Sequence, residues 1–401
     1  MPKTIKAALL GLSALLVIFV IGGGLGVRAA NNEGAYRQLG VYSEVLSRVR
    51  TEYVEEPNVS QVTDGALHGL LEALDANSSY LNPTEYKQFK DHKSDGKAAI
   101  GAAISKRFGY GAVISVLPNG PAAKAGVESG DIIEAVDGRS TREMSLAELR
   151  SLLNGQQGSN VALTLVRARK AEPVKVTVTR DAVVIPPISD KMLEDGIGYI
   201  KADSLMKGKA QEIAQDIKRL QHSGAKKLIL DLRNSAEGEE QEGVAVANLF
   251  LNHGTIGYVQ GQKYPKETFT ADASKAVTTL PLVVLVNRGT AGPAEIVASA
   301  ILDNARGDVV GDKTFGVGSI QKVIEIPDGS ALILSVAKYY TPAGKAIQDS
   351  AVTPNILIAD KDDDAALPDD EDSTPQQQAP KGPQEDEQLR RAVEVLKQQK
   401  A

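Results

Sequence analysis

The chain has 401 residues, 42% of them hydrophobic and 24% charged, so it is long enough for two or three domains and too apolar to be mainly disordered. The formal net charge is -6, but residues 360–372 hold eight acidic side chains and one lysine, so the rest is near neutral and no nucleic-acid partner is expected. Cysteine is absent, which excludes disulfides and thiol nucleophiles. The four histidines are scattered and have no metal-binding spacing, so we expect no metal, and we expect no cofactor.

Residues 1–30 are predicted to be a membrane anchor or signal segment. Lys3 and Lys6 precede Ala7–Val27, a run of 21 uncharged residues that is long enough to span a bilayer as a helix. Val27-Arg28-Ala29 is also compatible with a cleavage site, so a removable signal peptide stays open as the alternative. The basic residues before the run place the N-terminus in the cytoplasm and predict a membrane-anchored, extracytoplasmic protein on the periplasmic or cell-surface side.

Residues 31–95 are predicted to be an N-terminal helical region. Apolar residues recur at helical spacing over residues 39–49 and again over 62–74. Residues 74–81 are predicted to be a turn, and a short helix is predicted over 84–89. This region by itself indicates no chemistry.

Residues 96–182 change to short strands separated by glycines. The strands and the one helix among them are predicted at Val113–Val116, Ile132–Val136, Ser145–Leu153 (the helix), Val161–Arg167 and Val174–Thr179. Residues 121–133 read Pro-Ala-Ala-Lys-Ala-Gly-Val-Glu-Ser-Gly-Asp-Ile-Ile, which resembles the helix, turn and strand of bacterial PDZ domains, and Val136-Asp137-Gly138 resembles the hairpin that follows. This resemblance predicts a PDZ domain.

The PDZ resemblance implies a peptide-binding groove. In such domains a peptide C-terminus adds as a strand to the sheet edge, and its carboxylate is held by backbone N–H groups of a loop of small residues. The residues that match the loop are Ala98, Ala99, Ile100, Gly101 and Ala102. The family usually has glycine at the position of Ala99. The alternative is a PDZ-shaped spacer whose groove is closed.

Residues 183–357 are predicted to be an α/β core. Strands are expected at Ile197–Lys201, Lys227–Leu232, Leu282–Val286, Asp308–Gly311 and Leu332–Val336, and helices at Lys209–Gln221, Glu240–Leu251 and Pro293–Asn304. Residues 358–401 form an acidic tail rich in proline and glutamine, with a short terminal helix over Glu385–Lys400 that places Leu389, Val393 and Leu396 on one face.

The order of these segments, from Tyr36 to about Ile356, resembles the C-terminal processing (tail-specific) serine peptidases. The stretches that carry the resemblance are Leu74–Leu81, the PDZ signature, Leu230–Asn234, and Asp312–Gln321 continued by Pro327–Ser330. It implies a helical region, a PDZ domain and an α/β core of the tail-specific peptidase type. Together with the N-terminal membrane helix expected from the uncharged run, the predicted fold class is a multidomain α+β protein.

The resemblance also implies a serine nucleophile and a neutral lysine base 25 positions later. Gly292 and Val317 occupy these two positions without a gap, and neither has the required functional group. Gln321 matches a glutamine that supports the lysine in the family. The sequence thus predicts the peptidase scaffold without its catalytic pair.

The oxyanion-hole positions are also altered. By resemblance, one donor is the backbone N–H after the serine, but Pro293 has none. The second donor comes from a glycine-bearing loop, where this chain has Glu237 and Gly238. Pro293 and Glu295 have a structural explanation, because proline suits the first turn of a helix and an acidic residue there suits the helix dipole. Thr290 and Ser319 are the fallback nucleophiles.

Three functions follow as hypotheses. The first is an inactive family member that binds protein C-termini or unfolded tails through its PDZ domain, as an adaptor or regulator, alone, as a homo-oligomer or with an active homologue. The second is an active serine-type endopeptidase with an unorthodox nucleophile. The third is a structural subunit whose PDZ groove binds nothing.

Overall fold

The computed structural model describes residues 37–95, 98–167, 170, 172–359 and 386–399, and it divides the chain into two compact units, 1–67 and 68–401. The predicted membrane segment lies outside the described residues. Among the residues that are described, no helix is long and apolar enough to cross a bilayer.

The described part of the N-terminal region is mostly helical. Residues 37–52 form a helix, followed by α2 (Val59–Glu72), and α3 (Pro83–Asp95) extends beyond the predicted helix. One prediction is wrong: residues 74–81 are not a turn throughout, because they end in strand β1 (Ser79–Leu81). This strand pairs with a segment about 250 residues later, a long-range contact that no local pattern signals.

The PDZ segment is an antiparallel sheet of six strands with short helical elements between them. Its strands are β2 (Ala102–Arg107), β3 (Tyr110–Val116), β4 (Ile132–Val136), β5 (Arg139–Ser140), β6 (Asn160–Val166) and β7 (Val174–Thr179). Its helices are α4 (Pro121–Lys124), the short turn η1 (Thr141–Glu143) and α5 (Leu146–Leu153). Asp137 and Gly138, both with positive φ, turn the chain between β4 and β5 as hairpins with this dipeptide do. Ser145 caps α5 by accepting from the N–H of Glu148 at 3.1 Å.

The core contains a second six-stranded sheet. Its strands, in spatial order, are β17 (Ile356–Leu357), β14 (Asp308–Gly311), β13 (Leu282–Val286), β10 (Lys227–Asp231), β9 (Ile197–Lys201) and β8 (Ser189–Leu193). All pairings are parallel except that of β8. The helices between these strands are α6 (Lys209–His222), α7 (Glu240–Phe250) and α8 (Pro293–Asp303), with the turn η2 (Glu194–Gly196) before β9.

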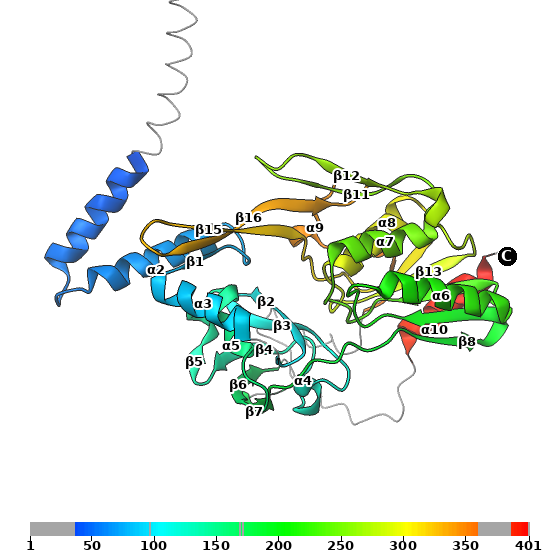
Figure 1. Ribbon diagram of the computed structural model, residues 1–401, viewed down its shortest axis with the longest axis horizontal. Helices are drawn as coiled ribbons and strands as arrows, with labels where there is room; N and C mark the ends of the chain where they lie inside the picture. The colour runs from blue at the N-terminus through cyan, green and yellow to red at the C-terminus, as the bar shows by residue number, and fades with distance from the viewer. Residues whose placement is uncertain (1–36, 96–97, 168–169, 171, 360–385, 400–401) are drawn as a thin grey trace, which may run out of the picture. The chain divides into compact units, whose positions relative to one another are not determined.

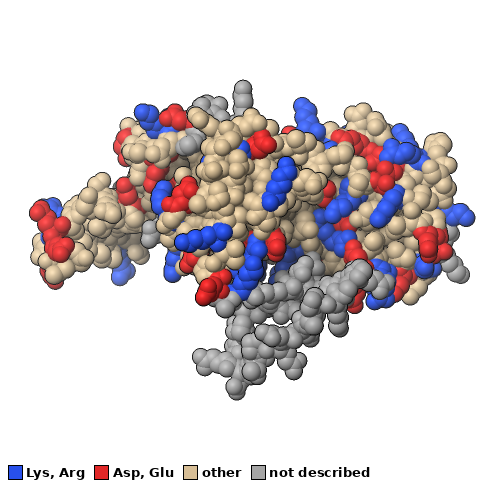
Figure 2. Space-filling model, turned by 90° about the horizontal axis from the view of Figure 1, so that it is seen from below, with Lys and Arg blue, Asp and Glu red and all other residues tan. Residues whose placement is uncertain are grey.

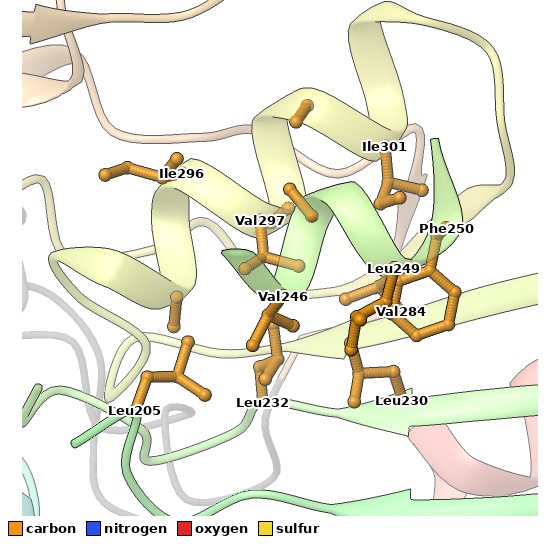
Figure 3. Packing of buried hydrophobic residues seen from close by; sticks show 14 of the residues in the cluster. Leu205, Leu230, Leu232, Val246, Leu249, Phe250, Val284, Ile296, Val297 and Ile301 are labelled. Atoms are coloured by element: carbon orange, nitrogen blue, oxygen red, sulfur yellow. The ribbon is translucent and has the colours of Figure 1, made fainter. Parts of the chain in front are cut away.

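Both faces of this parallel sheet are buried, which explains its unbroken apolar strands. On one face, α7 and α8 pack over alternate strand residues such as Leu230 and Val284 (Figure 3). On the other face, Ile229 and Leu285 contact the C-terminal helix α10 (Glu387–Gln398). The terminal helix is confirmed, and its buried side includes Leu396 as expected.

A five-stranded sheet completes the core. Its path is β1, β16 (Ala331–Tyr340), β11 (Thr255–Gln260) and β12 (Glu267–Thr270), and β15 (Ser319–Glu325) also pairs with β16. The short elements η3 (Ala273–Lys275) and α9 (Ile347–Ser350) lie in its connections. Figure 1 shows β15 and β16 as neighbouring ribbons, and their pairing fixes residues 319–325 next to 331–338. On the face in Figure 2, acidic and basic side chains are interspersed.

Candidate active site

The three loops that carry the candidate catalytic positions leave the same edge of the parallel sheet. They follow β10, β13 and β14, which are direct neighbours. Functional sites of open α/β sheets form at this carboxyl edge. Glu237, Gly292 and Val317 lie one in each loop, so strand pairing gathers residues that are distant in the sequence.

Gly292 lies at the start of α8 in a conformation that favours glycine. Its φ is 58° and its ψ is -119°. A Cβ built at this position would find, apart from its chain neighbours, the carbonyl oxygen of Ala236 as its nearest atom, at 3.9 Å. There is room for a side chain here, and a residue other than glycine would bear about 1–3 kcal/mol of backbone strain.

The carboxylate of Glu295 links the Gly292 turn to the loop of Val317. Its Oε2 accepts from the N–H of Gly292 at 3.0 Å and from that of Val317 at 2.8 Å. Its Oε1 accepts from the N–H of Gly316 at 2.9 Å and from the Thr314 hydroxyl. One oxygen atom thus binds the backbone at both candidate catalytic positions, which places them side by side.

Burial sets the titration of Glu295. The side chain has no exposed surface, and this desolvation raises its pKa to about 7. The Thr314 hydroxyl and the three N–H groups oppose the shift, because they favour the charged form. The sequence predicts only a dipole interaction for Glu295; its position three residues after Gly292, the spacing of a capping box, is the signal for the additional contact.

The backbone donors of the first turn of α8 are absent or occupied. Pro293 has no N–H, Ala294 donates to the carbonyl of Ala291 at 3.3 Å, and Glu295 donates to that of Gly292 at 3.0 Å. An oxyanion hole requires donors aimed at the site where charge develops. None of these three residues has a backbone N–H group that is free to bind an oxyanion.

The loop after β10 brings a carbonyl oxygen atom close to Gly292. The carbonyl of Ala236 faces Gly292, a contact that no sequence signal indicates. Burial raises the pKa of the Glu237 carboxyl, and the charge of Arg150 opposes this shift. A side chain at Gly238 would collide with the backbone of Leu205, its Cβ lying 2.4 Å from the carbonyl oxygen, so this glycine serves close packing. The loop therefore presents one acceptor, the Ala236 carbonyl, where a hole needs donors.

The hydroxyl of Thr290 is fully buried and engaged. It accepts from the N–H of Asn287 at 3.0 Å and donates to the carbonyl of Leu232 at 2.8 Å. It thereby joins the loop after β13 to the loop after β10. This geometry explains Thr290 as a structural residue.

Ser319 lies in a second polar cluster, at the start of β15. Its Oγ is contacted by the side-chain amides of Gln321 at 2.7 Å and of Asn77 at 3.3 Å. Gln321 therefore lies against Ser319, and Asn77 comes from the turn before β1. The two fallback hydroxyls thus contact backbone and amide groups.

The predicted peptide-binding loop is largely bound by the chain itself. Ala99 exchanges backbone hydrogen bonds with Asp181, at 3.0 and 3.3 Å, and the carbonyl of Ala98 accepts from Gly155 at 3.1 Å. Ala98 and Ile100 are buried, and Ala102 begins β2. At least one of the expected donors, the N–H of Ala99, is therefore occupied.

A cavity of about 340 Å³ lies between α5 of the PDZ segment and strands β15 and β16 of the core. Arg150, Asn77 and Gln321 are polar residues of its wall, and Phe89 and Ile333 are apolar ones. The Arg150 side chain is exposed to solvent, but many protein atoms lie near its guanidinium group. The desolvation that they cause lowers the pKa of Arg150. Its Nη2 donates to the carbonyl of Ile104 in edge strand β2 at 2.9 Å, where an added peptide strand would bind.

Comparisons with known proteins agree with this architecture. Residues 196–358 match the family described as Peptidase family S41, and residues 113–167 match the PDZ domain. The chain is 30% identical over 352 residues to a carboxy-terminal-processing protease of Bartonella bacilliformis, covering 86% of this chain and 80% of the relative. It is 35% identical over 320 residues to a carboxyl-terminal-processing protease of Picosynechococcus, covering 77% and 76%.

A solved structure supports the same assignment. The photosystem II D1 C-terminal processing protease superposes with a TM-score of 0.65 at 28% identity, covering 79% of this chain and 92% of that protein. The PDZ domain suggests binding of peptide C-termini. With a PDZ segment inserted before an α/β core whose loops converge on one sheet edge, the chain belongs to the carboxy-terminal-processing protease family, peptidase family S41.

Proposed function

We propose that this chain is a pseudopeptidase, a member of the family that binds protein tails without cleaving them. The observation that carries the proposal is the Gly292 turn, which has a positive φ and open space but no side-chain oxygen atom to attack a carbonyl carbon. Acyl transfer by this family's chemistry needs a nucleophile and an adjacent base. Val317, bound to the same carboxylate oxygen as Gly292, has no titratable group.

The surroundings of the turn support the proposal. Developing negative charge beside Gly292 would meet the Ala236 carbonyl, while Pro293 contributes no donor. Loss of one oxyanion donor costs about 10²- to 10³-fold in rate, and nearby negative groups add to that loss.

The biological role follows from the PDZ domain and the N-terminus. We propose that the protein is membrane-anchored and extracytoplasmic, and that it recognises protein C-termini or unfolded tails as an adaptor or regulator. An active homologue or a second copy of the chain would be its partner. The uncharged run Ala7–Val27 supports the anchor, and the PDZ match supports recognition of C-termini.

The test is a direct assay of turnover. The purified full-length chain is incubated with an unfolded reporter that ends in apolar residues, and the products are followed by mass spectrometry beside the Bartonella relative as positive control. We expect no product above the buffer control. Turnover by the purified chain would overturn the proposal, and its loss in Thr290→Val or Ser319→Ala would identify the nucleophile.

A binding assay separates the adaptor from a purely structural subunit. Peptides with an apolar last residue are titrated with a free carboxylate and, as the matched control, with a C-terminal amide. A charge-assisted hydrogen bond is worth about 1.5–3 kcal/mol, so the amide should bind roughly tenfold more weakly or worse. Equal binding of the two forms, or none of either, would contradict recognition of C-termini.

A further inference from the structure

The turn between β2 and β3 holds a phenylalanine in a backbone conformation that disfavours it. The residues on either side of Phe108 and Gly109 are directly paired, so these two alone form the turn, and their φ values are 54° and 81°. Two-residue hairpin turns with positive φ at both positions favour asparagine or aspartate before glycine. The β4–β5 hairpin of the same domain has such a dipeptide, Asp137-Gly138. Phe108 is therefore an exception to the turn chemistry that this domain uses elsewhere.

The fold does not compensate for this conformation by burying the ring. Among the described residues, the other non-glycine residues with positive φ are asparagine, aspartate or alanine, so Phe108 is the bulky member of the set. It is nevertheless 73% exposed. An exposed apolar side chain is ordinary by itself, but a bulky residue at positive φ is an outlier of the kind that gathers at functional sites. The combination points to a contact of the ring with something outside the folded chain.

Cationic side chains lie beside the aromatic rings of this turn. The guanidinium of Arg107 lies 5.2 Å from the centre of the Phe108 ring, and that of Arg142 lies 5.8 Å from the centre of the Tyr110 ring. Both arginines are exposed, and neither forms an ion pair with a side chain that the structure describes. The sequence has no acidic residue over 96–127, which includes the whole hairpin. The tip is therefore both aromatic and positively charged.

A buried hydroxyl group holds the base of the tip. The Thr141 hydroxyl accepts from the N–H of Gly111 at 3.0 Å and donates to the carbonyl of Ile133. Arg142 follows directly, and its Cγ lies 3.8 Å from the position of a Cβ built at Gly109, so its side chain lies against the turn. The rings and guanidinium groups are thus presented together by a preorganised turn, which lowers the entropy cost of binding.

We propose that the tip of the β2–β3 hairpin contacts the surface of an anionic bilayer, with Phe108 at the boundary of headgroups and acyl chains and Arg107 and Arg142 at the phosphate groups. An aromatic ring gains by leaving water at this boundary, and basic side chains bind anionic headgroups. The inference rests on the membrane anchor of the proposed function, because a tethered domain needs only a weak second contact. This contact would orient the PDZ domain on the membrane. A folded protein partner is the competing occupant, and entry of the ring among acyl chains distinguishes the two.

Tryptophan fluorescence tests the contact directly, because the chain has no tryptophan. Full-length Phe108→Trp is reconstituted in nanodiscs of phosphatidylcholine with phosphatidylglycerol, and in nanodiscs of phosphatidylcholine alone, each with and without brominated acyl chains. On the anionic nanodiscs the emission should shift to shorter wavelength, and the brominated chains should quench it. Val184→Trp, 79% exposed in the connection between β7 and β8, is the matched control and should show neither effect.

Charge variants test the arginines. Arg107→Gln and Arg142→Gln, each combined with Phe108→Trp, should lower the ratio of bound to free tip about fivefold on anionic nanodiscs, the value of one basic side chain near such a surface. Lys124→Gln removes an exposed cation elsewhere in the same domain and should leave the ratio unchanged. Equal losses in all three variants would show a general charge effect and overturn the assignment of the tip.

Phe108→Asn separates the contact from folding. This variant should resist urea at least as well as the parent chain, because asparagine suits the turn. The hairpin amides of the parent should exchange hydrogen more slowly on anionic nanodiscs than on neutral ones, and this protection should disappear in Phe108→Asn. A loss of urea resistance in the variant, or equal protection in both proteins, would contradict the reasoning.

The remaining outcomes distinguish this inference from the proposed function. Equal quenching of Phe108→Trp and Val184→Trp in loaded nanodiscs would overturn the contact and leave the anchor standing. A chain that does not enter nanodiscs would contradict the anchor. Vesicles of the same lipids added to the free Phe108→Trp chain then decide, since quenching supports the tip contact and its absence overturns it. Peptide turnover would contradict the pseudopeptidase and leave this result untouched.

Discussion

Restoring the catalytic pair is the most informative perturbation of this protein. Gly292→Ser places a hydroxyl in space that is open, since the nearest atom to the new Cβ is 3.9 Å away. The backbone there has a φ of 58°, so serine should cost about 1–3 kcal/mol of folding stability. Gly292→Ala bears the same strain without the hydroxyl and is the matched control. Urea unfolding of both variants measures this cost.

Catalysis should return only when the surroundings change as well. Gly292→Ser with Val317→Lys supplies a nucleophile and an amine, but Pro293 still lacks a donor, and the loop that is glycine-bearing in the family still has Glu237. Adding Pro293→Ala and Glu237→Gly should raise the rate by about 10²-fold or more over the double variant, which is the value of one oxyanion donor.

The assay is cleavage of a fluorogenic peptide with an apolar C-terminus, followed at several substrate concentrations so that kcat and KM are separated. The gain should lie mainly in kcat, because an oxyanion hole acts in the transition state. Equal rates for the double and quadruple variants would refute our account of the oxyanion site. A stability loss in Gly292→Ser that is absent in Gly292→Ala would refute the attribution to backbone strain.

Three further outcomes follow from the same contacts. Because the pKa of Glu295 is raised in the folded protein, protonation of its side chain stabilises the fold. This contribution to the free energy of unfolding is complete below about pH 4.5 and falls by about 3 kcal/mol as the pH rises towards 7. The Glu295→Gln variant should lack that part of the pH dependence in urea titrations, and an identical slope in both proteins would contradict the assignment. Thr290→Val should cost about 1–3 kcal/mol of unfolding free energy, because it removes the hydrogen bonds of the buried hydroxyl to the Leu232 carbonyl and from the Asn287 N–H. A neutral effect would show that the hydroxyl is not structural. Asp386→Asn should weaken the two hydrogen bonds to Arg233, at 2.8 and 2.9 Å, and so accelerate amide hydrogen exchange in α10, while the free energy of global unfolding falls by about 1 kcal/mol or less. Unchanged exchange would exclude this ion pair as the contact that holds the helix.

The sequence predicts most helices and strands, because the residues with apolar periodicity are also the residues that are buried in the structure. The strands at 132–136, 197–201 and 282–286 begin and end at the predicted residues, because each is an apolar run with turn residues on both sides. Helix α8 begins at Pro293, as its composition indicates. Strands β1 and β15 escape prediction because β16, their pairing partner, and not their own composition, stabilises them.

The candidate site divides in the same way. The sequence alone determines which functional groups are present, so the motifs show without a structure that glycine stands at 292, proline at 293 and valine at 317. Only the tertiary structure decides what surrounds them: Glu295 joins two loops through one oxygen atom, the Ala236 carbonyl lies near the turn, and Ala103 and Ile114 pack with Ala291. These features depend on contacts between residues that are remote in the chain, and a contact of that kind becomes visible only when the strands have paired and the domains have packed.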